Sequence, residues 1–136
     1  MNLTRIQEAF AEKIRGLKLG LPIVTPNALP NQKEHIAVIA TETGRVPIQQ
    51  NLEKWLGAVD CRISLNVSTD NTRINHYAEQ ITELFSVLDN DRSYLTTKNG
   101  IVLSVTDVRQ FPLYISGQTC SVNCRISFET FIRIRR

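Results

Sequence analysis

Three cysteines are the residues of this chain best suited to covalent or metal chemistry, and two of them open the same four-residue sequence. Cys-Arg-Ile-Ser begins at Cys61 and again at Cys124, and Cys120 precedes the second copy by four positions. A Cys-x3-Cys spacing without a nearby histidine does not match a zinc site. On a strand, Cys120 and Cys124 would lie roughly 13 Å apart, beyond disulfide reach. We therefore interpret the three cysteines as buried thiols that pack as small hydrophobic groups.

The other polar residues form no catalytic or ligand-binding pattern. The sequence has only two histidines, His35 and His76, and it lacks the GxSxG, HExxH, P-loop and dinucleotide-binding motifs. Asp89 and Asp91 flank Asn90, but the glycine and glutamate of a calcium loop are missing, which favours an acidic turn at the end of a helix. These observations predict a protein that is not an enzyme and has no catalytic residues, cofactor or metal site.

Length and composition predict one globular domain spanning residues 1–136. The chain is 42% hydrophobic and 21% charged, values that are ordinary for a globular protein. No apolar run approaches the ~20 residues of a membrane span, and the amphipathic N-terminal segment does not resemble a signal peptide. We therefore expect a cytoplasmic protein. Its net charge of +3 is small for a dedicated nucleic-acid-binding protein.

Two segments have the apolar periodicity of amphipathic helices. The second is the clearer one and begins near the polar residues 70–72, which offer N-cap side chains. The apolar residues at helical spacing are Leu3, Ile6, Phe10, Ile14 and Leu17 in the first segment, and Ile74, Tyr77, Ala78, Ile81, Leu84, Phe85 and Leu88 in the second.

Strands are predicted over residues 35–40, 55–67, 101–108 and 119–134, with a loop or short strand in the proline-marked segment 22–30. In 55–67 and 119–134, apolar and polar residues alternate, as in a strand that is packed on one face. The two Cys-Arg-Ile-Ser copies are thus two strands with the same packing requirement. The predicted fold is α+β, a mostly antiparallel sheet of four to five strands with two helices packed on one face.

The connection between the first two long strands, residues 43–54, is unusually long. Hairpin loops commonly take about two to five residues, and this connection mixes Gly44 and Pro47 with apolar residues. It is either a hairpin extension that folds back on its own sheet or an arm that contacts a partner. The second interpretation predicts an oligomer or tube interface that also includes the end of the last strand. The predicted interface residues are Arg45, Ile48, Gln49, Gln50, Lys54, Phe131 and Arg133.

The order of these segments resembles that of the tail terminator proteins of long-tailed bacteriophages. An amphipathic helix leads to PNALPN and HIAVIATETG, followed by WLGAVDCRISLNV, the polar turn STDNTR, the helix INHYAEQITELF and a final CSVNCRISFETFIRI. The resemblance covers nearly the whole chain. Its most typical part is the strand, polar turn and helix that carries AEQITELF.

The resemblance implies a structural protein of the virion, without a cofactor, that forms a ring, typically a hexamer, on the head-proximal end of the tail tube. Its partners would be other copies of itself, the tail tube protein and a head–tail connector protein, with DNA only as cargo through the ring and no membrane contact. It would act in the virion tail and in the host cytoplasm during assembly. The alternatives are a head-completion or neck connector component, and a small nucleic-acid-binding α+β module.

Overall fold

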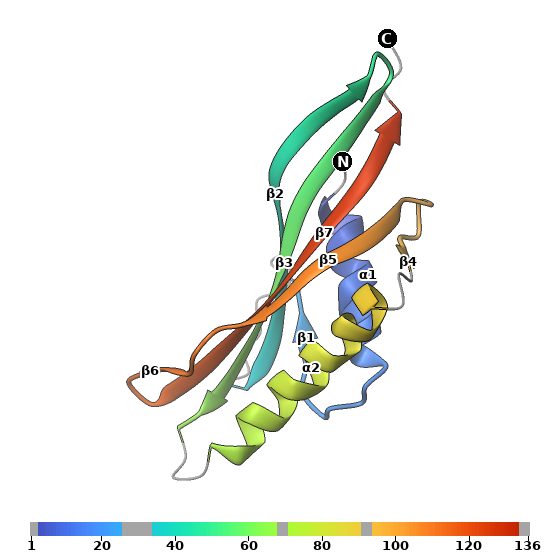
Figure 1. Cartoon of the computed structure of the whole chain (residues 1–136). Helices are drawn as coiled ribbons and strands as arrows, with labels where there is room; N and C mark the ends of the chain where they lie inside the picture. The colour runs from blue at the N-terminus through green and yellow to red at the C-terminus, as the bar shows by residue number, and fades with distance from the viewer. Residues whose placement is uncertain (1–2, 26–33, 68–70, 91–93, 134–136) are drawn as a thin grey trace.

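The computed structural model describes residues 3–25, 34–67, 71–90 and 94–133, and all structural statements concern these residues. They form two helices and one sheet (Figure 1). The elements in chain order are α1 (Leu3–Arg15), β1 (Ile23–Val24), β2 (His35–Gln49), β3 (Leu52–Asn66), α2 (Thr72–Asn90), β4 (Tyr94–Thr96), β5 (Val102–Gln110), β6 (Tyr114–Ser116) and β7 (Thr119–Arg133).

The sheet has seven strands in the order β1-β2-β3-β7-β5-β4, and β6 pairs with the beginning of β7. All pairs are antiparallel except β1 with β2, which makes the sheet mixed. The predicted α+β class is confirmed, but the predicted number of four to five strands is too low. The additional strands β1, β4 and β6 have only two or three residues each. Such strands are too short for an alternating pattern to be recognised in a sequence.

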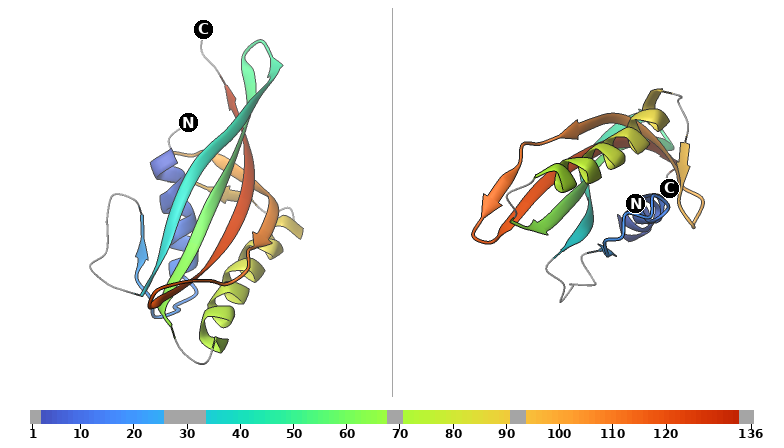
Figure 2. Two further views of the ribbon diagram at one scale, coloured as in Figure 1. Left: turned by 90° about the vertical axis from the view of Figure 1, so that its left-hand side faces the viewer. Right: turned by 90° about the horizontal axis from the view of Figure 1, so that it is seen from below.

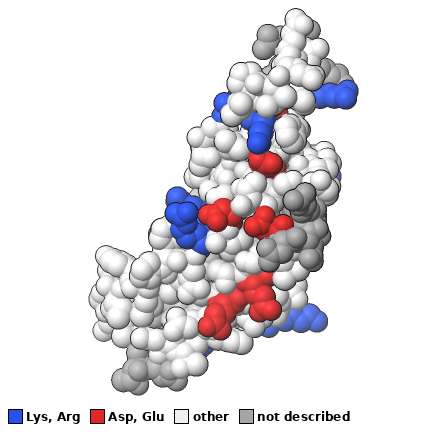
Figure 3. All heavy atoms as spheres, in the orientation of Figure 1, with Lys and Arg blue, Asp and Glu red and all other residues white. Residues whose placement is uncertain are grey.

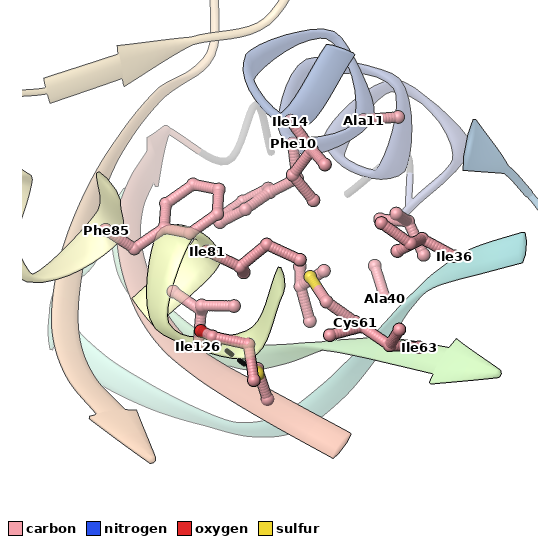
Figure 4. Packing of buried hydrophobic residues seen from close by; sticks show 14 of the residues in the cluster. Phe10, Ala11, Ile14, Ile36, Ala40, Cys61, Ile63, Ile81, Phe85 and Ile126 are labelled. Atoms are coloured by element: carbon pink, nitrogen blue, oxygen red, sulfur yellow. Dashed lines mark hydrogen bonds between the residues drawn. The ribbon is translucent and has the colours of Figure 1, made fainter. Parts of the chain in front are cut away.

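Both helices lie on the concave face of the curled sheet, as Figure 2 shows from below. Phe10 of α1 contacts both the other helix and the sheet. Its ring centroid lies 5.1 Å from that of Phe85 in α2 and 5.9 Å from that of Phe128 in β7. Around this contact, apolar side chains of both helices and of β2, β3, β5 and β7 form one buried cluster (Figure 4). Burial of this cluster is the main favourable contribution to folding.

The cysteines belong to the core. Cys61 and Cys124 are direct partners in the β3–β7 register, and both are free thiols with no exposed surface. Burial raises the pKa of Cys124 to about 12 and raises the pKa of Cys61 well above its ordinary value. Cys120 is buried and free as well. The interpretation of the cysteines as buried packing groups is therefore confirmed.

The prediction of a long loop over residues 43–54 is wrong. β2 continues to Gln49 and β3 begins at Leu52, so only residues 50–51 connect the strands. The segment is therefore an extension of the β2–β3 hairpin, and its contact with a partner stays a prediction. Register shifts interrupt the pairing between Glu42 and Gly44 and between Pro47 and Gln49. Each bulge changes which residues share a face, and this hides the period-two pattern of a strand.

Candidate functional site

The distal part of the sheet forms an arm, which we define as residues 43–57 of the β2–β3 hairpin and residues 129–133 of β7. The buried cluster ends before it, at Ala40, Val59 and Phe128 on the three strands. Figures 1 and 2 show β2, β3 and β7 continuing past both helices at this end of the molecule. Neither helix therefore covers the tip of the arm, which leaves its surface available to another chain.

All seven residues of the predicted interface lie on the arm. The strand register places Val46, Lys54 and Phe131 in one row across the three strands, and Gln49 and Arg133 on either side of Leu52 in another. Phe131 is thus next to Lys54, although many residues separate them in the sequence. The structure brings the predicted residues together, and their role as an interface stays a prediction.

Three of the exposed large apolar side chains lie on the arm. Val46 is 42% exposed, Ile48 47% and Phe131 57%. In Figure 3 the tip of the arm, at the top, presents mainly uncharged side chains, whereas acidic side chains gather lower down, over α2 and the middle of the molecule. Large exposed apolar groups that cluster together commonly mark a site of protein association.

The base of the arm is held by contacts of its own. Trp55 is only 6% exposed, and the Arg45 guanidinium lies 3.8 Å from the centroid of the Trp55 ring. The Trp55 Nε1–H donates to Glu53 Oε2 at 3.0 Å. Arg45 also pairs with Glu42. Lys54 Nζ lies 2.9 Å from Glu129 Oε2. Two of the predicted interface residues, Arg45 and Lys54, therefore have partners within the chain and stiffen the arm.

A second polar feature lies on the convex face, where Asp60 accepts hydrogen bonds from Arg125 Nε and Asn123 Nδ2, each at 2.9 Å. Burial raises the pKa of the Asp60 carboxyl, but the hydrogen bonds from Arg125 and Asn123 outweigh it, so that the pKa is lower than normal. The Phe111 ring centroid is 5.8 Å from the Arg125 guanidinium. Sequence reasoning missed this neighbour, because Phe111 lies beyond the end of β5 and no local pattern indicates where it folds.

Phe111 also lines an open pocket of about 310 Å³ with Arg62, Tyr114 and Asn123. Proteins that bind single-stranded nucleic acids commonly do so with aromatic and basic side chains on a sheet face of this kind. The ion pair with Asp60 neutralises Arg125, however, and this reduces the positive charge that a phosphate would meet. Within the described ranges, no group of His, Cys, Asp or Glu side chains is arranged to hold a metal ion. Neither of the two described helices is long and apolar enough to cross a membrane.

Comparisons with known proteins extend the description of the fold. No protein-family model matches this chain, and a comparison with curated proteins gives no match. One solved structure, of a protein that carries an identifier in place of a functional name, aligns over 96% of this chain and 96% of its own with a TM-score of 0.68. The two sequences are 11% identical. This similarity shows that another protein shares the fold, and it indicates no function.

Proposed function

We propose that this protein is a structural subunit of a bacteriophage virion, a tail terminator that forms a ring on the tail tube, stops its elongation and provides the joint to the head connector. The arm carries this proposal. It holds every predicted interface residue and three exposed apolar side chains, and neither helix covers its tip. The organisation of the sequence, which resembles that of tail terminators over nearly the whole chain, supplies the functional class.

A ring requires each copy to present two different surfaces to its neighbours. An arm that reaches from one copy to the next makes such a head-to-tail contact, and head-to-tail contacts close into rings when the rotation between copies permits. In our proposal Ile48, Gln49 and Gln50 at the tip make this contact with the next copy, whereas Phe131 and Arg133 on β7 belong to the surface that meets the tail tube. Arg45 and Lys54 act indirectly, because their internal contacts hold the arm in shape.

The arm is small, and this predicts weak association of the isolated protein. Stable complexes commonly bury about 1,200–2,000 Å² in total, whereas the contact proposed here involves only a few side chains at a hairpin tip. We expect a monomer or a weak, concentration-dependent oligomer by light scattering after size exclusion, and ring formation on the end of the tail tube. A hexamer that persists on dilution would contradict the weak association and strengthen the ring.

The arm can be tested with a matched pair of substitutions. Ile48→Asp places a charge on the arm, and Val87→Asp places the same charge on the exposed side of α2, at 49% exposure compared with 47% for Ile48. Both variants should fold and melt like the wild type, because surface substitutions commonly change stability by less than about 0.5 kcal/mol.

Tails assembled with Ile48→Asp should be overlong and variable in length in electron micrographs, whereas those with Val87→Asp should have the normal length. Uniform tails of normal length with both variants, joined to heads as usual, would refute the proposed role of the arm. Uniform tails that fail to join heads would instead favour the alternative of a head-completion or neck connector component, which differs from a terminator in its assembly partner.

A further inference from the structure

The end of β7 is an open sheet edge. Within a strand, the backbone N–H and C=O of successive residues point alternately to the two neighbouring strands. The Asn123 carbonyl accepts from the Phe111 N–H at 2.9 Å, so the backbone of Asn123 faces away from β3. The β3–β7 register runs without a shift to Arg133. Phe131 and Arg133, an even number of residues later, therefore face away from β3 too.

No strand of the described chain pairs with this end of β7 on its outer side. The β5 ladder stops at Ser104 opposite Glu129. Beyond it, the Thr130 hydroxyl donates to the Val102 carbonyl at 2.6 Å and holds the beginning of β5 against β7. The backbone groups of Phe131 and Arg133 thus lie at an edge that can accept a further strand.

A groove runs along this edge. It has a volume of about 780 Å³ and lies between the β4–β5 hairpin and the end of β7. We call it the β7 groove, and its lining includes Tyr94, residues 99–102 and residues 129–133. Tyr94 is 65% exposed and Val102 48%, so apolar surface is available on the wall opposite Phe131. An extended peptide needs both an open backbone edge and adjacent apolar surface to bind as an added strand.

The opposite edge of the sheet, formed by β2, is poorly suited to pair with the β7 edge of another copy. On the part of β2 that precedes the arm, the Ala40 N–H donates to the Gln7 side chain of α1 at 2.9 Å, and β1 pairs with Ile36 and Ala37. Further along, Pro47 has no N–H to offer, and two register shifts interrupt the strand. Bulges and prolines on an edge strand disfavour pairing with another chain. The β2 edge of a second copy is therefore a poor occupant of the groove.

Arg133, at the end of the β7 groove, favours a partner segment that carries a carboxylate. Glu129 is already paired with Lys54, whereas the exposed Arg133 makes no ion pair with any of the described residues. We propose that the β7 groove binds an extended segment of a different protein as an added strand beside Phe131 and Arg133. The segment has apolar residues at alternate positions and a carboxylate opposite Arg133. This inference does not depend on a role in tail assembly, since any protein with such a segment satisfies it.

The direct test is a titration with a model strand, followed through the backbone amide resonances of the full-length protein. The probe is a short end-blocked peptide in which valine alternates with threonine and one central threonine is replaced by glutamate. The amides of Phe131 and Arg133 should shift and become protected from hydrogen exchange. The Ile132 amide should change little, because its backbone faces β3.

Two peptide controls distinguish strand addition from nonspecific binding. A peptide with lysine in place of glutamate should bind about two- to fivefold more weakly, as expected for the loss of one exposed ion pair. A peptide in which every backbone nitrogen is methylated has neither edge free to pair, and it should not protect the two amides. If it protects them as well as the unmodified peptide does, or if millimolar unmodified peptide leaves them unchanged, the proposal is wrong.

Substitutions at Arg133 separate its side chain from its backbone. Arg133→Ala should bind the glutamate and lysine peptides equally, and Arg133→Pro should weaken both further because it also removes the N–H that faces the groove. If the amides of Phe131 and Arg133 instead shift with protein concentration in the absence of peptide, a second copy occupies the groove, and the assignment to a different protein is overturned. None of these results depends on the tail-length assay.

Discussion

Gly57 is the position in the arm where a single methyl group should be most damaging. It lies on β3, where it is paired with Phe128 on β7 and with Glu42 on β2. A Cβ at residue 57 would lie 2.4 Å from Phe128 Cζ and 2.7 Å from the Thr41 carbonyl oxygen. Ordinary contact begins near 3.4 Å, so the ring must move by about 1.0 Å and the backbone of β2 by about 0.7 Å. The Phe128 ring packs against Phe10 in the core and has little room to move.

The expected loss in the free energy of unfolding for Gly57→Ala is about 2–3 kcal/mol, in the upper part of the range for overpacked interiors. For a domain of this size, 1 kcal/mol corresponds to about 3–5 °C in melting temperature. The melting temperature should therefore fall by about 6–15 °C. Guanidinium denaturation gives the free energy directly, and an unchanged slope would show that the denatured state is the same.

Gly44→Ala is the matched control on the same hairpin. A Cβ there would have only Leu56 Cδ1 nearby, at 3.9 Å, which is an ordinary contact. The same substitution should change stability by less than about 0.5 kcal/mol. In the double variant with Phe128→Leu, the cost of Gly57→Ala should shrink by about 1 kcal/mol, because part of the ring that it meets is gone. Equal effects of the two glycine substitutions would refute the close approach of β2, β3 and β7 at this point.

Three further predictions follow from the core and the convex face. Burial raises the pKa of Asp60, but the hydrogen bonds from Arg125 and Asn123 outweigh it and keep the pKa below its ordinary value of about 3.9. The stability that Asp60 contributes is therefore present above that pH and is lost as the pH falls through the lowered pKa. Denaturation curves between pH 6 and 2 (roughly the range in which carboxylates titrate) should therefore show a smaller acid loss for Asp60→Asn than for the wild type. The buried thiols of Cys61 and Cys124 should react with a thiol reagent only as fast as the protein unfolds, and rapid reaction of the native protein would contradict their burial. Phe85→Ala, which empties a fully buried site, should cost about 3–5 kcal/mol by urea denaturation, and a loss below 1 kcal/mol (roughly that of a surface site) would contradict the helix packing.

The sequence alone determined the parts of the fold whose burial is one-sided. The stripes of α1 and α2 and the alternation around the two Cys-Arg-Ile-Ser copies each report a single buried face, and a local period is enough to reveal it. The structure accordingly has Phe10, Ile81 and Phe85 in the core and pairs Cys61 with Cys124. The grouping of arm residues as a candidate interface also came from sequence, from exposed apolar residues without a periodic partner.

Only the tertiary structure decided how the arm is built and where its edges are open. The bulges of β2 removed the period that would have identified residues 43–49 as a strand. The strands β1, β4 and β6 form because a long neighbour offers an edge, and their few residues have no pattern of their own. The row of Val46, Lys54 and Phe131 depends on the register of β2, β3 and β7, and β7 is distant from the other two in the sequence. Such pairings are stabilised by contacts between segments that are remote in the sequence, and local sequence patterns do not report these contacts.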